Sequence, residues 1–305
     1  MFGLFYFPLP SKIRMNFLNP FWARKKIATL DADKDAHEIA HLAFEVRYGT
    51  PLFTHSIFSV AFARQAAVPS IARVLYRGGK GGIITNTKKR NNDTLLFFGE
   101  FYKHGDKNEG REAIELLNFI HSHFPITNEE NLYTLATIVC EPKRNAIFLS
   151  NKDLFTAKEF RAMYNFWKRL CVLMNINSIP ESESAMYQWY EDFERKNYGY
   201  SDEGKKIVEA LAAEFAERWY PRFMHYHGTQ YYYSLFDDFL LQTLHIPKPH
   251  FIYRYAVKGY MWFQLRILFQ ILPDPSDRNV LDYYTADYPD YHISKVGPFP
   301  AKAKQ

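Results

Sequence analysis

The chain has 305 residues, of which 47% are hydrophobic and 18% aromatic, so it can bury a substantial core. Its 38 Lys and Arg stand among 33 Asp and Glu, and the net charge of +5 is spread along the chain rather than gathered in a long run. That balance argues against nucleic acid as a partner. The two cysteines, Cys140 and Cys171, both lie in apolar helical patterns, which excludes a disulfide framework and a cysteine-based zinc site.

The chain starts with an apolar segment, MFGLFYFPLPSKIRMNFLNPFW. Two prolines and two basic residues interrupt it well short of the roughly 20 residues that a membrane span needs, and it lacks the charged start and the cleavage site of a signal peptide. We therefore expect no transmembrane segment, a cytoplasmic location, and an N-terminal arm over residues 1–33 that docks on the protein's own surface. Peripheral contact with a membrane is the alternative.

Apolar residues recur at spacings of three and four almost throughout, which predicts helices rather than strands. The evidence for a strand is confined to the short run from Gly82 to Thr85. Thr127 and Thr156, each followed three residues later by Glu, fit capping boxes at two helix starts. The predicted helices cover residues 34–48, 53–77 with a break at Pro69, 89–104, 109–124, 129–148, 156–176, 183–197, 203–219, 229–245 and 250–272.

These helices predict a single large all-α domain over residues 34–272. The chain from 273 to 305 contains several prolines, which favours an extended C-terminal arm that closes over the body.

The most informative segment runs over two consecutive helices, from Arg90 to His121. Arg90 and Thr94 share one helix face with two phenylalanines, because their spacings are three and four. Asp93 lies three residues from Arg90, close enough to pair with the guanidinium and orient it. The structural alternative is a helix cap with a surface ion pair.

On the second of these helices, His121 falls in an apolar stripe, and His123 falls in a neighbouring one. A histidine in such a stripe is more often a satisfied core residue than a ligand. Periodicity does not choose between the two histidines. Elsewhere, His37 and His41 have a zinc-like spacing, although we expect no metal there.

The order of several short motifs resembles the haem-dependent oxygenases of the mpaB type and the rubber oxygenases, or latex-clearing proteins. The resemblance covers roughly residues 35–300. Each motif is short, so their order and spacing carry the likeness. The motifs are FARQAAVPSIARVL at 62–75, RNNDT at 90–94, LNFIHSHF at 117–124, LYTLATIVCEP at 132–142, FWKRL at 166–170, IPES at 179–182 and YPDY at 288–291, followed by Gly297 and Pro298.

This resemblance implies a globin-related helical core with additional helices that binds haem b. His121 matches the axial iron ligand of the family, and Arg90 and Thr94 match its distal-side pair, with Arg90 also able to hold the haem. The Asp-Thr pair at Asp93 and Thr94 is similar to the pair found in the mpaB-like branch, whereas the rubber-cleaving branch has Lys-Thr at this point. Rubber oxygenases also carry a distal glutamate, but residues 68–77 contain no carboxylate, so that base is not carried over.

The implied activity is that of a haem-dependent oxidoreductase of the dioxygenase type. It would insert dioxygen across a carbon-carbon double bond of a hydrophobic small molecule or polyprenyl substrate and give two carbonyl products. The alternative from another class is a non-catalytic helical protein that binds haem or lipid.

Overall fold

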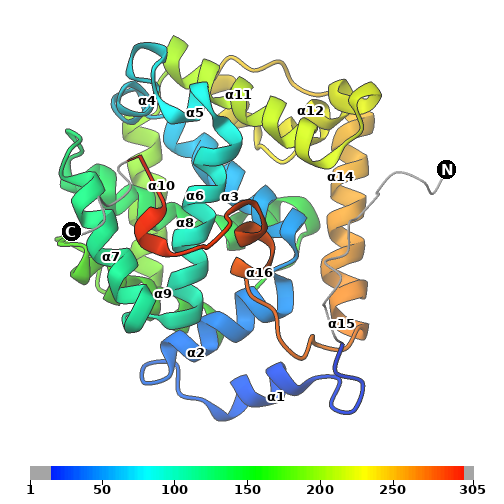
Figure 1. Cartoon of the computed structure of the whole chain (residues 1–305). Helices are drawn as coiled ribbons and strands as arrows, with labels where there is room; N and C mark the ends of the chain where they lie inside the picture. The colour runs from blue at the N-terminus through cyan, green and yellow to red at the C-terminus, as the bar shows by residue number, and fades with distance from the viewer. Residues whose placement is uncertain (1–14, 299–305) are drawn as a thin grey trace.

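The computed structural model describes residues 15–298, and within this range the protein is built from helices (Figure 1). The described residues form no β-strand, and their single β-type contact is an isolated antiparallel bridge between Met15 and Pro275. The predicted all-α class is therefore confirmed. The relationship to globins stays a prediction.

The longest helices form the body of the protein. They are α3 (Pro51–Ala66), α6 (Thr87–His104), α7 (Asn108–His121), α8 (Asn128–Ser150), α9 (Ala157–Leu173), α10 (Glu183–Asn197), α11 (Asp202–Trp219) and α14 (Phe251–Phe263). Shorter helices connect and cover them: α1 (Trp22–Thr29), α2 (Ala36–Ala40), α4 (Pro69–Tyr76), α5 (Gly82–Thr85), α12 (His225–Tyr233), α13 (Asp238–Thr243), α15 (Phe269–Ile271) and α16 (Leu281–Tyr284).

Helix starts follow the local sequence signals. Thr127 and Thr156 both form complete capping boxes with the glutamate three residues on, which confirms both predicted starts. Pro69 begins α4, where a proline has no backbone N–H to lose to the helix. The predicted break at Pro69 is therefore the boundary between α3 and α4.

Several predicted elements differ from the structure. The run from Gly82 to Thr85 is the helix α5 and not a strand. The predicted helix 34–48 contains a π-helical turn at His41–Val46, and the one at 250–272 contains a second at Gln264–Leu268. The predicted helix 229–245 is divided, because Asp237 caps a new helix, α13, with its own side chain.

The two predicted arms contain helices of their own. Residues 1–14 of the N-terminal arm lie outside the described part of the chain, and the rest of it forms α1, which buries Ala23 and Ile27. The chain after residue 272 lies against α6 and α7 (Figure 1, red). Its Val280 donates a backbone hydrogen bond to the buried carboxylate of Glu45 at 2.5 Å.

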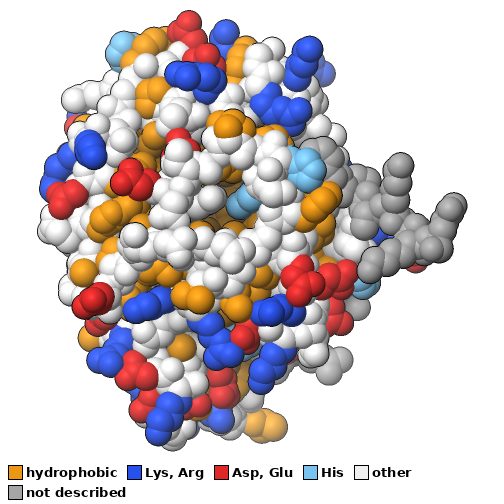
Figure 2. Space-filling model, turned by 90° about the vertical axis from the view of Figure 1, so that its left-hand side faces the viewer, with side chains coloured by type: hydrophobic (Ala, Val, Ile, Leu, Met, Phe, Trp, Pro, Cys, Tyr) orange, Lys and Arg blue, Asp and Glu red, His pale blue; other side chains and the backbone are white. Residues whose placement is uncertain are grey.

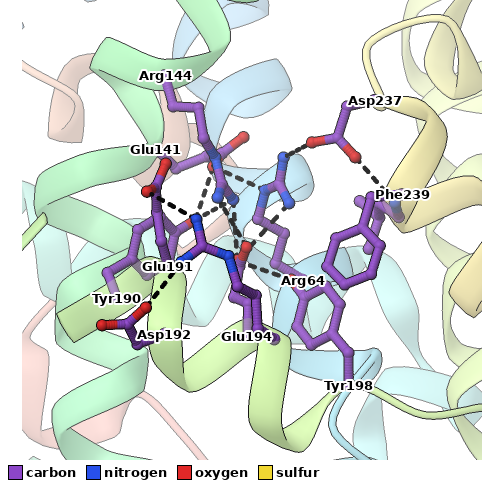
Figure 3. Close-up of polar contacts among 12 residues, drawn as sticks. Arg64, Glu141, Arg144, Tyr190, Glu191, Asp192, Glu194, Tyr198, Asp237 and Phe239 are labelled. Carbon is purple, nitrogen blue, oxygen red and sulfur yellow. Dashed lines mark hydrogen bonds and ion pairs between the residues drawn. The ribbon is translucent and has the colours of Figure 1, made fainter. Parts of the chain in front are cut away.

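A buried cluster of charged side chains ties the helices of the body together (Figure 3). Arg64 of α3 lies 2.7 Å from the Glu141 carboxylate of α8, and Arg144 lies 2.7 Å from Glu194 of α10. Burial disfavours the charge of Arg64, but the surrounding acidic groups, Glu141 first among them, raise its pKa well above the usual value. Removing one of these side chains would leave an opposite charge buried without its partner, which would destabilise the fold.

Candidate functional site

A cavity of about 600 Å³ lies among α3, α4, α5, α6, α7 and α8. The C-terminal segment closes one side of it with Lys295, Gly297 and Pro298. Figure 2 shows a hollow in one face of the protein, with hydrophobic side chains and a histidine inside it. Among residues 15–298, His121 is the only histidine that lines the cavity. Phenylalanines dominate its wall: Phe58, Phe62, Phe97, Phe98, Phe101 and Phe124.

The structure brings the three candidate residues together. His121, Arg90 and Thr94 all line the cavity, and Asp93 lies there too. His123 does not line it: its side chain is exposed, and its Nδ1 atom lies 2.8 Å from the carbonyl oxygen of Phe119. Of these two histidines, His121 therefore lines the cavity and His123 does not, and the role of His121 as a ligand stays a prediction.

His121 is the last residue of α7, and its side chain is partly buried against the cavity. Its ring nitrogens have no hydrogen-bond or ion-pair partner among residues 15–298. Burial, followed by the nearby charge of Arg90, lowers the pKa of His121 to about 4. The imidazole is therefore neutral near pH 7, which is the form that binds a metal ion.

Arg90 lies one turn into α6, and no carboxylate of the described chain forms an ion pair with its side chain. The guanidinium donates to the hydroxyl of Thr94 and lies 5.6 Å from the centroid of the Phe62 ring. Burial lowers the pKa of Arg90, and Asp93 raises it only in part. Arg90 is only partly buried, but a cation at the wall of an apolar cavity without a paired anion is still unfavourable, so this site favours a ligand that carries a negative charge.

The predicted pairing of Asp93 with Arg90 is wrong. Asp93 lies 2.7 Å from the ammonium of Lys89 and accepts a hydrogen bond of 2.7 Å from the Tyr288 hydroxyl. The capping alternative for Arg90 is also wrong, because Asn86 is the residue that caps α6. The Asp93 carboxylate, which its sequence spacing placed beside Arg90, instead holds Tyr288 of the C-terminal segment against α6.

Thr94 is already engaged within its own helix. Its hydroxyl donates to the backbone carbonyl of Arg90 at 3.0 Å and accepts from the Arg90 guanidinium. The first contact fixes the Thr94 hydroxyl, and the second holds the Arg90 guanidinium beside the cavity. Thr94 is therefore a positioning residue for Arg90 in this arrangement.

The cavity has a surplus of positive charge. Its lining carboxylates are Asp93, which Lys89 neutralises, and Glu130, which the capping box with Thr127 occupies. The α4 side of the lining contributes no carboxylate, in line with the absence noted for residues 68–77. The cationic residues that line it are Arg77, Lys89, Arg90 and Lys295.

The segment from His37 to His41 reads HEIAH, which matches the HExxH pattern of zinc peptidases. The structure gives both histidines other partners: His37 Nε2 lies 2.8 Å from the Tyr102 carbonyl, and His41 Nδ1 lies 2.6 Å from Glu45. The described residues contain no group of three potential ligands that could hold a metal ion.

The histidines near residue 226 lie away from the cavity lining. His225 and His227 are in α12, where their rings contact the Tyr220 carbonyl and the Tyr253 hydroxyl. Neither of them lines the cavity.

Sequence reasoning missed a buried pair of a histidine and a glutamate, His55 and Glu214. His55 of α3 accepts a hydrogen bond of 2.8 Å from Trp219 Nε1, so its proton is on Nε2, 3.1 Å from the Glu214 carboxylate. Burial disfavours the charged carboxylate, but His55 and Arg218 outweigh it and lower the pKa of Glu214 to about 2. His55 sits among apolar residues of α3, and no motif marks it.

A search against protein-family models and a search of curated proteins found no match to this chain. The resemblance to haem-dependent oxygenases therefore stays a prediction based on the order of the motifs. No helix between residues 15 and 298 is both long and apolar enough to cross a membrane.

Proposed function

We propose that the protein binds haem b in this cavity through His121 and acts as an oxygenase on a hydrophobic, isoprenoid-like alkene. The observation that carries the proposal is that one apolar cavity contains both a histidine without a hydrogen-bond partner and an arginine without a carboxylate partner. His121 offers a neutral imidazole without a protein partner, and Arg90 offers a cation without a carboxylate.

The donor set of the cavity fits haem. The porphyrin supplies four iron ligands itself, so a single histidine suffices from the protein. The two propionates of haem are anions that would offset the charge of Arg90 and of a further cation such as Lys295. The phenylalanine walls match the apolar faces of the macrocycle.

Bound haem would supply the chemistry of dioxygen, whose two oxygen atoms end on the two carbons of the cleaved double bond as carbonyl groups. The chain's own residues would prepare the site for that reaction. The aromatic walls bind an apolar substrate and exclude water. Arg90 donates hydrogen bonds toward negative charge that develops in the cavity, and Thr94 fixes the direction of its guanidinium.

One observation also favours the second candidate, a non-catalytic protein that binds haem or lipid. An arginine without a carboxylate partner at the wall of an apolar cavity, such as Arg90, is what a fatty carboxylate needs, with or without iron. The two candidates differ in whether dioxygen is consumed.

The test has two stages. The purified protein is titrated with haem, and the proposal predicts a Soret band that reaches its plateau at one equivalent. A protein that stays colourless after this reconstitution refutes the haem site. Oxygen uptake is then followed with polyprenyl alkenes for the unmodified protein, Arg90→Ala and Thr94→Ala. Uptake that both variants lose supports the oxygenase, whereas a red protein without uptake favours the non-catalytic candidate.

A further inference from the structure

A helical rod at the surface of the protein turns an aromatic face outward. The rod comprises α14, the π-helical turn at Gln264–Leu268 and α15, and Figure 1 places it on the side opposite to α7. Its inner side buries Val257, Met261 and Leu265. Its exposed large apolar side chains are Phe251, Ile252, Tyr255, Trp262, Phe263 and Ile271.

The rod exposes aromatic side chains where a comparable helix exposes charged ones. Phe251, Tyr255 and Trp262 follow one another at spacings of four and seven residues, so they share one side of the rod. A surface helix normally turns its polar side outward. α11 follows this rule, and its exposed residues are Asp202, Lys206, Glu209, Ala213 and Glu217. The outward side of the rod is therefore a candidate contact surface, since contiguous exposed apolar patches mark such surfaces.

The charge on this side of the protein is positive. Between residues 239 and 273 the chain has four Lys and Arg and no Asp or Glu. Arg266 is the exposed cation of the rod, and its guanidinium donates to the backbone carbonyls of Ser150 and Asn151. No carboxylate between residues 15 and 298 forms an ion pair with it. The aromatic face thus contains a cation whose charge no acidic group neutralises.

The segment at the start of α12 has the same composition. His227 of α12 lies 2.8 Å from the hydroxyl of Tyr253 in the first turn of the rod. Four residues before His227, the side chain of Phe223 is 83% exposed. Its neighbour Arg222 is exposed as well, and no carboxylate of the described chain pairs with it. An exposed aromatic ring and an exposed cation therefore also occur together beside the rod.

We propose that this face binds the surface of a phospholipid bilayer that contains anionic lipid. Tyr and Trp side chains favour the interface between headgroups and acyl chains, and exposed Arg side chains attract anionic headgroups. The rod lies along the plane of the bilayer, with Tyr255 and Trp262 in that interface. A second copy of the chain fits less well, because a twofold contact through this face would bring its cations together without an acidic partner.

Sedimentation of the full-length protein with vesicles tests this surface. The vesicles contain phosphatidylcholine, with or without phosphatidylserine. The proposal predicts binding that is at least about fivefold tighter with phosphatidylserine and that weakens as NaCl is added. Arg222→Glu should reduce this preference, whereas Arg73→Glu, a change at an exposed site on α4, should leave it intact.

The aromatic side chains are tested as a pair. Tyr255→Ser combined with Trp262→Ser should weaken binding at least about tenfold. Phe119→Ser combined with Ile147→Ser is the matched control, because both of its sites are exposed and lie on α7 and α8. This control should bind as tightly as the unmodified chain.

Tryptophan fluorescence reports the contact without removing it. Trp262 is the only exposed residue among the five tryptophans of the chain. Brominated phosphatidylcholine in bound vesicles should quench the fluorescence of the protein, and Trp262→Phe should remove most of this quenching while binding persists.

Three results overturn the proposal. The first is a lack of binding to vesicles that contain phosphatidylserine, and dimerisation without lipid that the Tyr255→Ser and Trp262→Ser pair abolishes would then assign the face to a second copy. The second is equal binding by the unmodified chain and this double variant. The third is quenching that Trp262→Phe leaves unchanged, which would place the contact elsewhere on the protein.

Discussion

The guanidinium of Arg90 donates a hydrogen bond to the hydroxyl of Thr94, one turn further along α6, and forms no ion pair with a carboxylate between residues 15 and 298. Its nearest acidic residue in sequence, Asp93, is occupied by Lys89 and Tyr288. The protein thus keeps a cation at the wall of an apolar cavity without neutralising it. This imbalance is the physical basis for expecting an anionic group on the ligand.

The first prediction follows from the cost of that uncompensated charge. Arg90→Met should raise the free energy of unfolding of the ligand-free protein by about 1 kcal/mol, because an apolar side chain of similar length replaces a desolvated cation. The same change should weaken haem binding at least about tenfold through the loss of a propionate contact. Urea unfolding and haem titration measure the two effects.

Arg73→Met, an exposed site on α4, is the control for this pair of measurements and should change stability by less than about 0.5 kcal/mol. A clear loss of stability in Arg90→Met would show that the guanidinium has an anionic partner within the protein.

The buried charged cluster around Arg64 should respond in the opposite way. Arg64→Met removes the cation that faces Glu141, Glu194 and Asp237, and it leaves these carboxylates in the core without their partner. We expect the free energy of unfolding to fall by about 3–5 kcal/mol in urea. A change below about 1 kcal/mol would mean that water or Arg144 compensates the cluster, contrary to its burial.

The pH dependence of stability provides a third prediction. The pKa of His121 is about 4 in the folded protein against 6.5 for the free side chain. The unfolded chain therefore binds a proton at His121 between pH 6.5 and pH 4 while the folded protein does not, so this residue lowers stability as the pH falls through that window. The loss should amount to about 2–3 kcal/mol by pH 4.

Urea unfolding of the ligand-free protein at several pH values between 7 and 4 measures this slope. His121→Leu should flatten the part of it that His121 contributes, whereas His123→Leu, a change at an exposed histidine, should leave it intact. If the two variants have the same pH profile, His121 is not the desolvated histidine that the structure indicates.

The closure of the cavity by the C-terminal segment provides a fourth prediction. Tyr288 and Tyr291 each donate a hydrogen bond of 2.7 Å to a carboxylate of α6, Asp93 and Glu100 respectively. Tyr288→Phe should lower the free energy of unfolding by about 1 kcal/mol, and it should speed hydrogen exchange in residues 288–298. It should also speed the transfer of haem to apomyoglobin. Unchanged exchange in that segment would show that the hydroxyl does not hold it.

The fold was largely predictable because helical periodicity and caps are local. Thr127, Thr156 and Pro69 mark helix boundaries through their own side chains, and all three boundaries were found. The interruption of the predicted helix at 229–245 was not, since it depends on where Asp237 turns its carboxylate, toward the new helix and Arg64.

The candidate site was predictable only in part. The motif order singled out Arg90, Thr94 and His121, and these residues do line one cavity. Asp93 takes Lys89, which is as close to it on the helix as Arg90 is, and Tyr288, which is far away in sequence. Spacing within a helix shows which side chains are neighbours, but it does not show which distant segment will compete for them.

The most direct test of the central claim is the absorption spectrum of His121→Gly with haem, recorded with and without added imidazole. We predict that this variant loses the histidine-ligated Soret spectrum and that imidazole restores it, because the free ring occupies the space left by the side chain. His123→Gly should keep the native spectrum without any addition. A native spectrum in His121→Gly, or its loss in His123→Gly alone, would contradict the assignment of His121 as the iron ligand.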